Sequence, residues 1–283
     1  MATPIGHLQD ITLRALHVLA SVHVVYCEDT RRTRILLQAH GIRQRLISFH
    51  THNESRRIPE ILRRLDAGEA VALVSDAGMP GISDPGSRLV YAVWTHGHRV
   101  TVVPGPSAVL SALAMAGVPT VPFVFWGFVP RQRARKMAWL TRCQHMPATH
   151  LAFESGNRLL DTLQSIAARF PDTSVILVKE ITKIHERRYA GLAMTLFTHL
   201  QAHPDERAGE WVIVLDTRAV AHAADLTRTA DTPATVRAMA RDLRQHGIPP
   251  RTTARMIARW LGLSANIVYR MMMGSDEGES HEQ

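Results

Sequence analysis

The chain has 283 residues, of which 46% are hydrophobic, so it can bury the core of one large domain or of two smaller ones. Lysines and arginines number 33 against 25 aspartates and glutamates, and the net charge of +8 favours an anionic partner such as nucleic acid. Two distant cysteines, Cys27 and Cys143, exclude a disulfide framework and indicate free thiols in a reducing compartment. We expect a cytoplasmic protein with no membrane association, because prolines interrupt the long uncharged stretch of residues 100–130.

The first 117 residues alternate short apolar runs with amphipathic segments, which predicts an N-terminal α/β domain. Strands are predicted at residues 22–26, 46–49, 70–74 and 99–103. Helices are predicted at residues 11–20, 33–40, 58–66 and 87–94, and a further helix begins after Ser107, a good N-cap. The repeated order of strand, loop and helix predicts a mostly parallel sheet.

The rest of the chain predicts a second α/β domain at residues 118–220, a helical module at residues 221–275 and an acidic, disordered tail at residues 276–283. In the second domain, strands are predicted at residues 123–128, 149–153, 174–178 and 211–215, and helices at residues 131–145, 157–168 and 194–201. In the module, helices are predicted at residues 235–245 and 252–273, the latter broken near Gly262, with residues 219–231 as a loop. Ala258, Gly262 and Val268 have the spacing of a helix-turn-helix, and a plain helical hairpin is the alternative.

Residues 70–86 combine a buried strand with a loop of three glycines, two prolines and two aspartates. Glycines allow a ligand to approach the backbone, and a strand, such a loop and a helix form nucleotide-type sites at the carboxyl edge of a parallel sheet. The loop contains no lysine, and its acids Asp76 and Asp84 suit hydroxyl, amino or sulfonium groups rather than a polyphosphate. This composition indicates S-adenosylmethionine as the ligand, and an ordinary turn with a capping aspartate is the alternative.

Several short motifs occur in a fixed order along the chain: Thr3-Pro4-Ile5-Gly6, Glu28-Asp29-Thr30-Arg31, Phe49-His50-Thr51-His52-Asn53-Glu54, the SDAGMPGISDPG loop, Pro104-Gly105-Pro106-Ser107-Ala108, Gly127-Phe128-Val129-Pro130, Phe153-Glu154-Ser155, Lys179-Glu180-Ile181-Thr182-Lys183 and Gly209-Glu210. This ordered set resembles the ribosomal small-subunit RNA (cytidine-2′-O)-methyltransferases of the tetrapyrrole methylase superfamily over nearly the whole chain. The sequence departs from that family at His7 and Met79, where the family usually has Asn and Thr.

The resemblance implies two α/β domains of tetrapyrrole-methylase type with the cofactor cleft between them, and a small C-terminal helical module. It implies transfer of a methyl group from S-adenosylmethionine to a cytidine ribose 2′-hydroxyl of small-subunit ribosomal RNA, by a homodimer. One alternative is a tetrapyrrole C-methyltransferase on the same scaffold, whose substrates are also anionic. Another is a non-catalytic RNA-binding factor that has kept the fold.

The loop and the resemblance together predict the binding residues. The expected cofactor-binding residues are Asp76, Gly78, Pro80, Gly81, Ile82, Asp84, Gly105, Ser107, Ala108, Phe153 and Glu154. The expected substrate-binding residues are Pro4, Gly6, Glu28, Asp29, Arg31, His50, Asn53, Glu54, Arg131 and Arg135. Asp29 or Thr30 could instead cap the next helix.

Lys179 and Glu180 are the predicted catalytic residues, because they follow an apolar strand at the edge where α/β active sites lie. A partly buried lysine can lose its proton and act as a base, whereas the alternatives are a structural ion pair or a phosphate contact. No metal is expected, since His50, His52 and Glu54 lack a fourth ligand and methyl transfer from S-adenosylmethionine needs none.

A basic segment at the start of the second domain is a further candidate for RNA contact. It contains no acid and includes Arg131, Arg133, Arg135, Lys136 and Arg142. Such a segment suits RNA phosphates, and a solvated basic face is the alternative.

Only Met1 and Ala2 precede the Thr-Pro-Ile-Gly motif, whereas the family has an apolar strand there. Without that strand its neighbours would expose unpaired backbone groups. We therefore expect the natural protein to begin about ten to fifteen residues earlier, since a strand takes about five or six residues.

Overall fold

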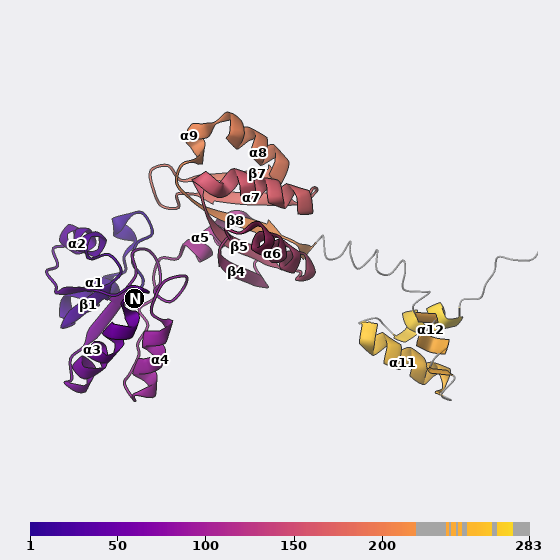
Figure 1. The fold of residues 1–283 in the computed structure, drawn as a ribbon, viewed down its shortest axis with the longest axis horizontal. Helices are drawn as coiled ribbons and strands as arrows, with labels where there is room; N and C mark the ends of the chain where they lie inside the picture. The colour runs from indigo at the N-terminus through magenta and orange to yellow at the C-terminus, as the bar shows by residue number, and fades with distance from the viewer. Residues whose placement is uncertain (219–235, 238, 242, 245–247, 262–264, 274–283) are drawn as a thin grey trace, which may run out of the picture. The chain divides into compact units, whose positions relative to one another are not determined.

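The computed structural model describes residues 1–218, 236–237, 239–241, 243–244, 248–261 and 265–273. Contacts between residues divide the chain into two units, Met1–Arg218 and Ala219–Gln283. The first unit contains two sheets, which define a first lobe around β1–β3 and a second lobe around β4–β8 (Figure 1). The predicted α/β fold is confirmed by this arrangement.

The first lobe is built on a three-stranded parallel sheet in the order β2-β1-β3. Its strands are β1 (Val24–Cys27), β2 (Leu46–Ser48) and β3 (Val71–Val74). Its helices are η1 (Leu8–Asp10), α1 (Leu13–Ser21), α2 (Thr30–Ala39), α3 (Glu54–Asp66) and α4 (Ser87–Thr95). The predicted positions of the three strands and of α1, α2, α3 and α4 are confirmed to within a few residues, whereas η1 was not predicted.

Two apolar layers enclose this sheet because successive strand residues face opposite sides. Val25 and Cys27 of β1 pack with Leu19 of α1 and Leu36 of α2 on one side. On the other side, Tyr26 belongs to the cluster that α3 and α4 contribute to. The carboxyl ends of β1 and β3 therefore lie together at one edge of a rigid core.

The second lobe contains a five-stranded mixed sheet in the order β4-β5-β8-β6-β7. Its strands are β4 (Phe123–Phe128), β5 (Thr149–Ser155), β6 (Ser174–Lys179), β7 (Arg187–Leu192) and β8 (Glu210–Asp216). The β4–β5 pair is parallel, whereas the other three pairs are antiparallel. Strand β7 was not predicted, and no pattern in the sequence indicated that β8 would insert between β5 and β6.

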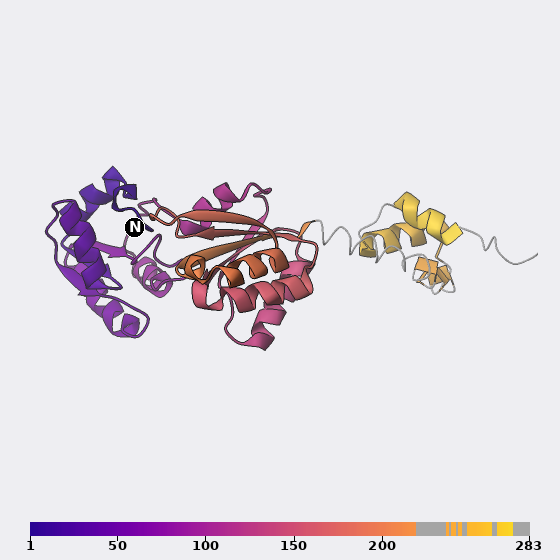
Figure 2. The ribbon, with the colours of Figure 1, turned by 90° about the horizontal axis from the view of Figure 1, so that it is seen from above.

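Helices cover both faces of the second sheet, as Figure 2 shows. They are α5 (Ala108–Ala116), α6 (Arg133–His145), α7 (Gly156–Arg169), α8 (Ala193–Ala202) and the short α9 (Pro204–Arg207). Ser107 caps α5, as predicted, by accepting a hydrogen bond from the Leu110 amide.

Helix α5 packs on the second sheet rather than on the first. Its residues Val109 and Leu113 share a buried cluster with Ile176 of β6 and Val214 of β8. The guanidinium of Arg188 in β7 donates to the carbonyls of the last turn of α5 at 2.8 Å. The two lobes therefore join near residues 104–107, before α5, although we expected α5 to close the N-terminal domain.

Residues 99–103 do not form the predicted strand. Val103 is buried, but Val100 and Val102 are exposed. Met1 and Ala2 lie along this part of the lobe: the Met1 amino group donates to the Leu73 carbonyl at 2.9 Å, and the Ala2 amide donates to the Val103 carbonyl at 3.1 Å. These contacts replace a regular ladder between β3 and residues 99–103.

The second unit contains α11 (Pro250–Leu261) and α12 (Ala265–Met273), which contact each other. Ala258 and Val268 lie in one apolar cluster with Val236 and Ala240. Contact between the two helices does not distinguish the predicted helix-turn-helix from a helical hairpin. Gly262, the predicted loop at residues 219–231 and the acidic tail lie outside the described residues.

Among the helices of the described residues, none combines the length and the apolar character needed to cross a bilayer.

Candidate functional site

The carboxyl ends of β1 and β3 carry a cluster of carboxylates. Asp76 follows β3, and its carboxylate accepts a hydrogen bond from the Asp29 amide after β1 at 2.9 Å. Asp84 lies close enough to Glu28 and Asp76 for their charges to raise its pKa. The parallel sheet brings these acids together because both strands end at the same edge.

The loop after β3 leaves its backbone accessible at Gly81, whereas Gly78 is buried at its base. Gly78 and Gly81 have φ angles of 77° and 80°, a conformation that suits glycine. A Cβ at Gly81 would meet the Ser87 nitrogen at 3.7 Å and otherwise point into open space. The loop is fixed at its base because Gly78 and Thr3 exchange two backbone hydrogen bonds of 2.9 and 3.0 Å. The loop is therefore held firmly at Gly78, and its accessible backbone lies at Gly81.

The carboxyl group of Asp84 has a pKa raised to about 6, chiefly by burial and further by the charges of Glu28 and Asp76. The pKa of Glu28 is raised as well, again by burial first and then by Asp76. Asp29 behaves differently, because hydrogen bonds with Arg31 lower its pKa to about 2. This edge therefore contains two carboxyl groups with raised pKa values, that of Asp84 being about 6, beside one that stays ionised.

We expect Asp84→Asn to stabilise the protein at pH 8. Because the folded-state pKa of Asp84 lies above its ordinary value of 3.8, the folded protein loses relative stability as the pH rises from about 4 through about 6. The amide carries no charge, so the midpoint of urea unfolding should rise at pH 8 and change little at pH 4. Asp172→Asn, at an exposed position outside the cluster, is the matched control. An equal gain in both variants, or no gain at pH 8, would contradict the assignment.

A cleft of about 270 Å³ lies beside this loop. Its lining comes from the N-terminal segment, from α2, from the start of the loop and from the second lobe. The residues are Thr3, Pro4, Ile5, Gly6, Leu8, Arg32, Thr33, Ile35, Leu36, Ser75, Asp76, Ala77, Lys183 and Glu210. Of the predicted site residues, the cleft unites Pro4 and Gly6 with Asp76.

The loop between β6 and β7 closes one side of the cleft. Its Thr182 hydroxyl accepts a hydrogen bond from the His7 amide at 3.1 Å. The Lys183 ammonium lies 3.0 Å from Glu180 and 2.8 Å from Glu210. Burial alone would lower the pKa of Lys183, but the hydrogen bonds to Glu210 and Glu180 outweigh it and raise that pKa. Lys183 is therefore a fixed positive charge in the cleft and not a base.

Glu180 stabilises this loop through its contacts with Lys183 and Glu210. Burial favours a higher pKa for its carboxyl, but the hydrogen bond from the Glu210 amide and the contact with Lys183 leave the pKa lowered. A Cβ on Gly209 would lie 2.8 Å from the Glu180 side chain, so glycine is required for this contact. Glu180 is thus an ionised group that holds Lys183 and Glu210 in place.

Lys179, the other predicted catalytic residue, does not line the cleft. It is 6% exposed, its ammonium donates to the Glu206 carbonyl at 2.6 Å, and it lies over the Trp211 ring. Its observed contacts connect β6 with α9, the segment that leads to Glu210.

Phe153 and Glu154 also make internal contacts. The Phe153 ring packs against Phe125 and Phe128. Glu154 is 2% exposed and accepts a hydrogen bond from the Thr162 hydroxyl at 2.7 Å.

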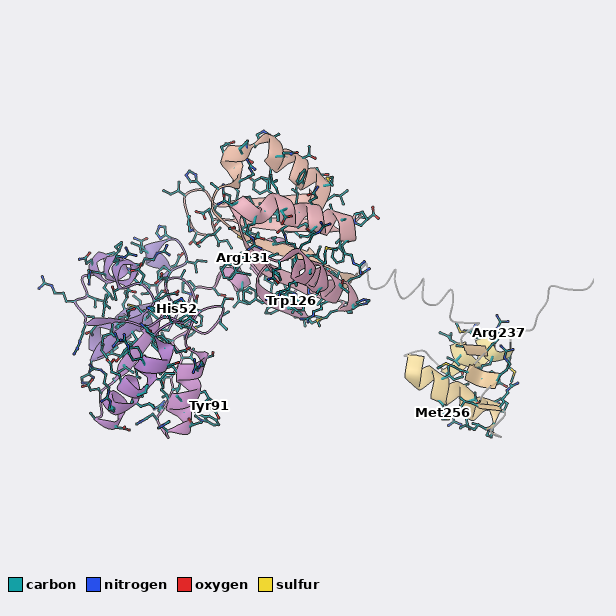
Figure 3. All side chains as sticks on the ribbon, viewed as in Figure 1. His52, Tyr91, Trp126, Arg131, Arg237 and Met256 are labelled. Carbon is teal, nitrogen blue, oxygen red and sulfur yellow. The ribbon has the colours of Figure 1, made fainter. Side chains whose placement is uncertain are left out.

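Lys136, expected in the basic RNA-binding segment, is also buried, where its ammonium contacts Asp161 and Thr162. Arg131 and Arg135 are exposed, and Figure 3 labels Arg131. The RNA-binding interpretation of this segment therefore does not extend to Lys136, whose charge is compensated inside the lobe.

The remaining predicted substrate residues lie around the ends of β1 and β2. Asp29 caps α2 by accepting from the Arg31 amide, the alternative that the sequence left open. Asn53 accepts a hydrogen bond from the His50 amide, and Figure 3 labels the neighbouring His52. Glu54 is 5% exposed with Arg88 at 3.8 Å. These residues do not line the cleft.

The other predicted cofactor residues form a separate group. Pro80, Gly81, Ile82 and Asp84 lie along the loop, and Gly105, Ser107 and Ala108 lie at the junction before α5. In the described part of the chain, no group of three or more histidines, cysteines or acids has an arrangement that could hold a metal ion.

Eleven of the fourteen residues that line the cleft were not predicted as site residues, among them Arg32, Ile35, Lys183 and Glu210. Arg32 and Ile35 belong to an amphipathic helix, and nothing in that pattern marks their faces as functional. Lys183 and Glu210 do belong to short motifs of the sequence. The sequence could not show, however, that they lie close to Pro4 and Gly6 in the folded protein.

The chain thus combines two α/β lobes, a glycine-rich loop at the carboxyl edge of the first sheet and an adjoining charged cleft. Solved structures agree on the fold: a diphthine synthase aligns with a TM-score of 0.57 at 14% identity, over 75% of this chain and 87% of its own. A cobalt precorrin-4 methyltransferase aligns with a TM-score of 0.54 at 18% identity, over 74% and 90%. The model of the Tetrapyrrole (Corrin/Porphyrin) Methylases matches residues 2–196, and the chain belongs to that family.

Within the family, the chain is similar to proteins named ribosomal RNA small subunit methyltransferase I. The protein of this name from Xylella fastidiosa (strain Temecula1) is 39% identical over 95% of this chain and 96% of its own length. That of Escherichia coli O157:H7 is 37% identical over 95% and 91%. The Thermotoga maritima protein is 43% identical over 215 residues, which are 76% of this chain and 96% of that protein.

Proposed function

We propose that this protein transfers a methyl group from S-adenosylmethionine to the 2′-hydroxyl of a cytidine in small-subunit ribosomal RNA. The observation that carries the proposal is the identity of 37–39% to relatives named for small-subunit ribosomal RNA methylation over 95% of the chain. The resemblance further supports a homodimer that acts in the cytoplasm. Sedimentation of the purified protein would test the oligomeric state.

The loop after β3 fits the cofactor. Gly81 leaves the backbone of the loop free of a side chain, so a nucleoside can lie close against it there. The Asp84 carboxylate, ionised above about pH 6, suits ribose hydroxyls and the positive charge of a sulfonium. Bound there, S-adenosylmethionine supplies a methyl group already activated for transfer.

The protein has two tasks in such a reaction: to align the acceptor hydroxyl and to take up its proton. We assign alignment to the walls of the cleft, including Pro4 and Gly6, and to the loop of Glu180 and Lys183. The carboxylates at the ends of β1 and β3 are suitable proton acceptors, and Asp76 stands both in this cluster and in the cleft.

An assay with radiolabelled S-adenosylmethionine tests the function. Small ribosomal subunits, free ribosomal RNA and a tetrapyrrole precursor are offered in parallel. Label in the subunit RNA, located on a cytidine ribose by nuclease digestion and mass spectrometry, is the expected result. Label in the tetrapyrrole would show a C-methyltransferase instead, and RNA binding without any methylation would show a non-catalytic factor.

Lys179→Ala should lower the turnover of RNA methylation at least about tenfold and leave the affinity for S-adenosylmethionine unchanged. We assign Lys179 a positioning role, because its hydrogen bond to the Glu206 carbonyl anchors the segment that presents Glu210. Lys179→Arg can restore that bond and should recover part of the rate. Failure of arginine to recover activity in a well-folded variant would favour direct participation of the lysine amine.

Removing the second unit after Arg218 should weaken binding to small subunits and flatten its salt dependence. Residues 225–270 contain eight arginines and three aspartates, and each lost phosphate contact lowers the salt slope by about 0.7–0.9. The affinity for S-adenosylmethionine should be unchanged, because the proposed cofactor loop lies within the unit of residues 1–218. Circular dichroism checks that the shortened chain folds. An unchanged salt slope would show that this unit makes no phosphate contact.

A further inference from the structure

The cleft and the proposed cofactor loop are neighbours that share one short segment. Ser75, Asp76 and Ala77 line the cleft, whereas residues 78–86 and 104–108 do not. A ligand in the cleft would therefore lie beside the cofactor rather than on it. Methyl transfer requires that adjacency, because donor and acceptor atoms must be within contact distance.

The size of the cleft limits what it can hold. Its volume of about 270 Å³ is close to the lower end for small-molecule pockets, about 300 Å³. One nucleoside fits such a space, whereas a stretch of stacked RNA does not. Enzymes that act on single nucleotides commonly take them out of the stack into a pocket of this kind.

The walls of the cleft combine apolar surfaces with a charged edge. Ile5, Leu8 and Ile35 provide apolar surfaces against which a flat base can pack. Lys183 and Glu210 stand side by side, 2.8 Å apart, and offer a donor next to an acceptor. This arrangement is complementary to a base edge that presents an acceptor next to a donor.

Glu210 is placed to discriminate between bases. Its side chain is 78% exposed, and Lys183 engages one of its two carboxylate oxygens. Carboxylates accept from the amino group of cytosine, and they repel the carbonyl that uracil has at the same position.

We propose that the cleft is the acceptor-nucleotide site and that the Glu210–Lys183 pair reads the amino-bearing edge of its base. This inference rests on the proposed RNA methylation and adds the residues that select the nucleotide. Glu180 holds Lys183 from behind, so the ammonium keeps its place when the base enters. Arg32, 3.7 Å from Asp76, lies at the end of the cleft next to the cofactor loop.

The test compares subunits reconstituted with cytidine or uridine at the methylated position. For the parent protein we expect a strong preference for cytidine. Glu210→Gln should reduce the ratio of kcat/KM values at least about tenfold, the order expected for one lost base contact, because a glutamine amide can donate to uracil. Glu69→Gln makes the same chemical change at a glutamate paired with Arg64 and should leave the ratio unchanged.

Ile35→Trp tests occupation of the cleft without relying on the charged pair. Ile35 is 59% exposed, so the fold should tolerate the larger tryptophan side chain, which narrows the cleft. We expect methylation to fall at least about tenfold, with the affinity for S-adenosylmethionine unchanged by calorimetry.

The outcomes separate this inference from the function on which it rests. A parent protein that binds S-adenosylmethionine and methylates RNA, with both variants behaving like the parent, overturns the inference alone. Loss of S-adenosylmethionine affinity in Ile35→Trp also overturns it, since the cleft would then belong to the cofactor. A parent protein that methylates no RNA overturns both.

Discussion

Replacing Gly6 with alanine should lower the rate of RNA methylation by about a hundredfold. An added Cβ would lie 2.6 Å from the side chains of Lys183 and Thr182 and 2.8 Å from the Ile181 carbonyl oxygen. The carbonyl cannot move without its loop, so the N-terminal segment and the β6–β7 loop must separate. A shift of about 1 Å in a catalytic arrangement can cost about a hundredfold in rate.

The control for this prediction is Gly97→Ala. Gly97 has open space around its Cβ position and a φ of 80°, so this change adds backbone strain without a collision. Single-turnover methylation measures the chemical step in each variant, and thermal unfolding measures stability. If Gly6→Ala methylates within a few-fold of the parent, the packing of these two segments does not set the geometry of the site.

Gly81→Val should reduce the affinity for S-adenosylmethionine by about a hundredfold or more while the fold persists. The valine side chain would extend from Gly81 into the space above the loop, where the proposed cofactor approaches the backbone. Titration calorimetry with S-adenosylmethionine measures the effect directly.

Gly41→Val is the matched control for Gly81→Val. Gly41 has a φ of 66° and open space around it, so the substitution imposes comparable backbone strain away from the loop. If both variants bind S-adenosylmethionine like the parent, the loop is not the cofactor site. If both lose affinity and stability together, backbone strain rather than blocked approach explains the loss.

Local patterns were sufficient to predict most of the elements. The apolar run before Lys179 gave β6, and Ser107 marked the start of α5 because a cap is a property of a few neighbouring residues. Residues 99–103 have the composition of a strand, yet a strand also needs a partner along its length. Their alternation could not show that Met1 and Ala2 supply isolated contacts instead of a ladder.

The candidate site was predicted less completely because its parts meet only in three dimensions. The loop after β3 was recognisable from its glycines and acids. For Lys179 and Lys183, four positions apart, the sequence alone could not decide which one faces the cleft. The structure distinguishes them, since Lys179 is held by the Glu206 carbonyl and Lys183 lines the cleft.

The division of the chain at Arg218 has a consequence for how such enzymes can diversify. Residues 1–218 hold the proposed chemistry as one unit, and the basic helices of the second unit pack around their own core. The second unit can therefore be exchanged, extended or lost in evolution at the boundary after Arg218. Such a change would redirect the enzyme to another RNA site without altering the unit of residues 1–218. The same boundary gives protein engineers a natural point at which to graft a different targeting domain.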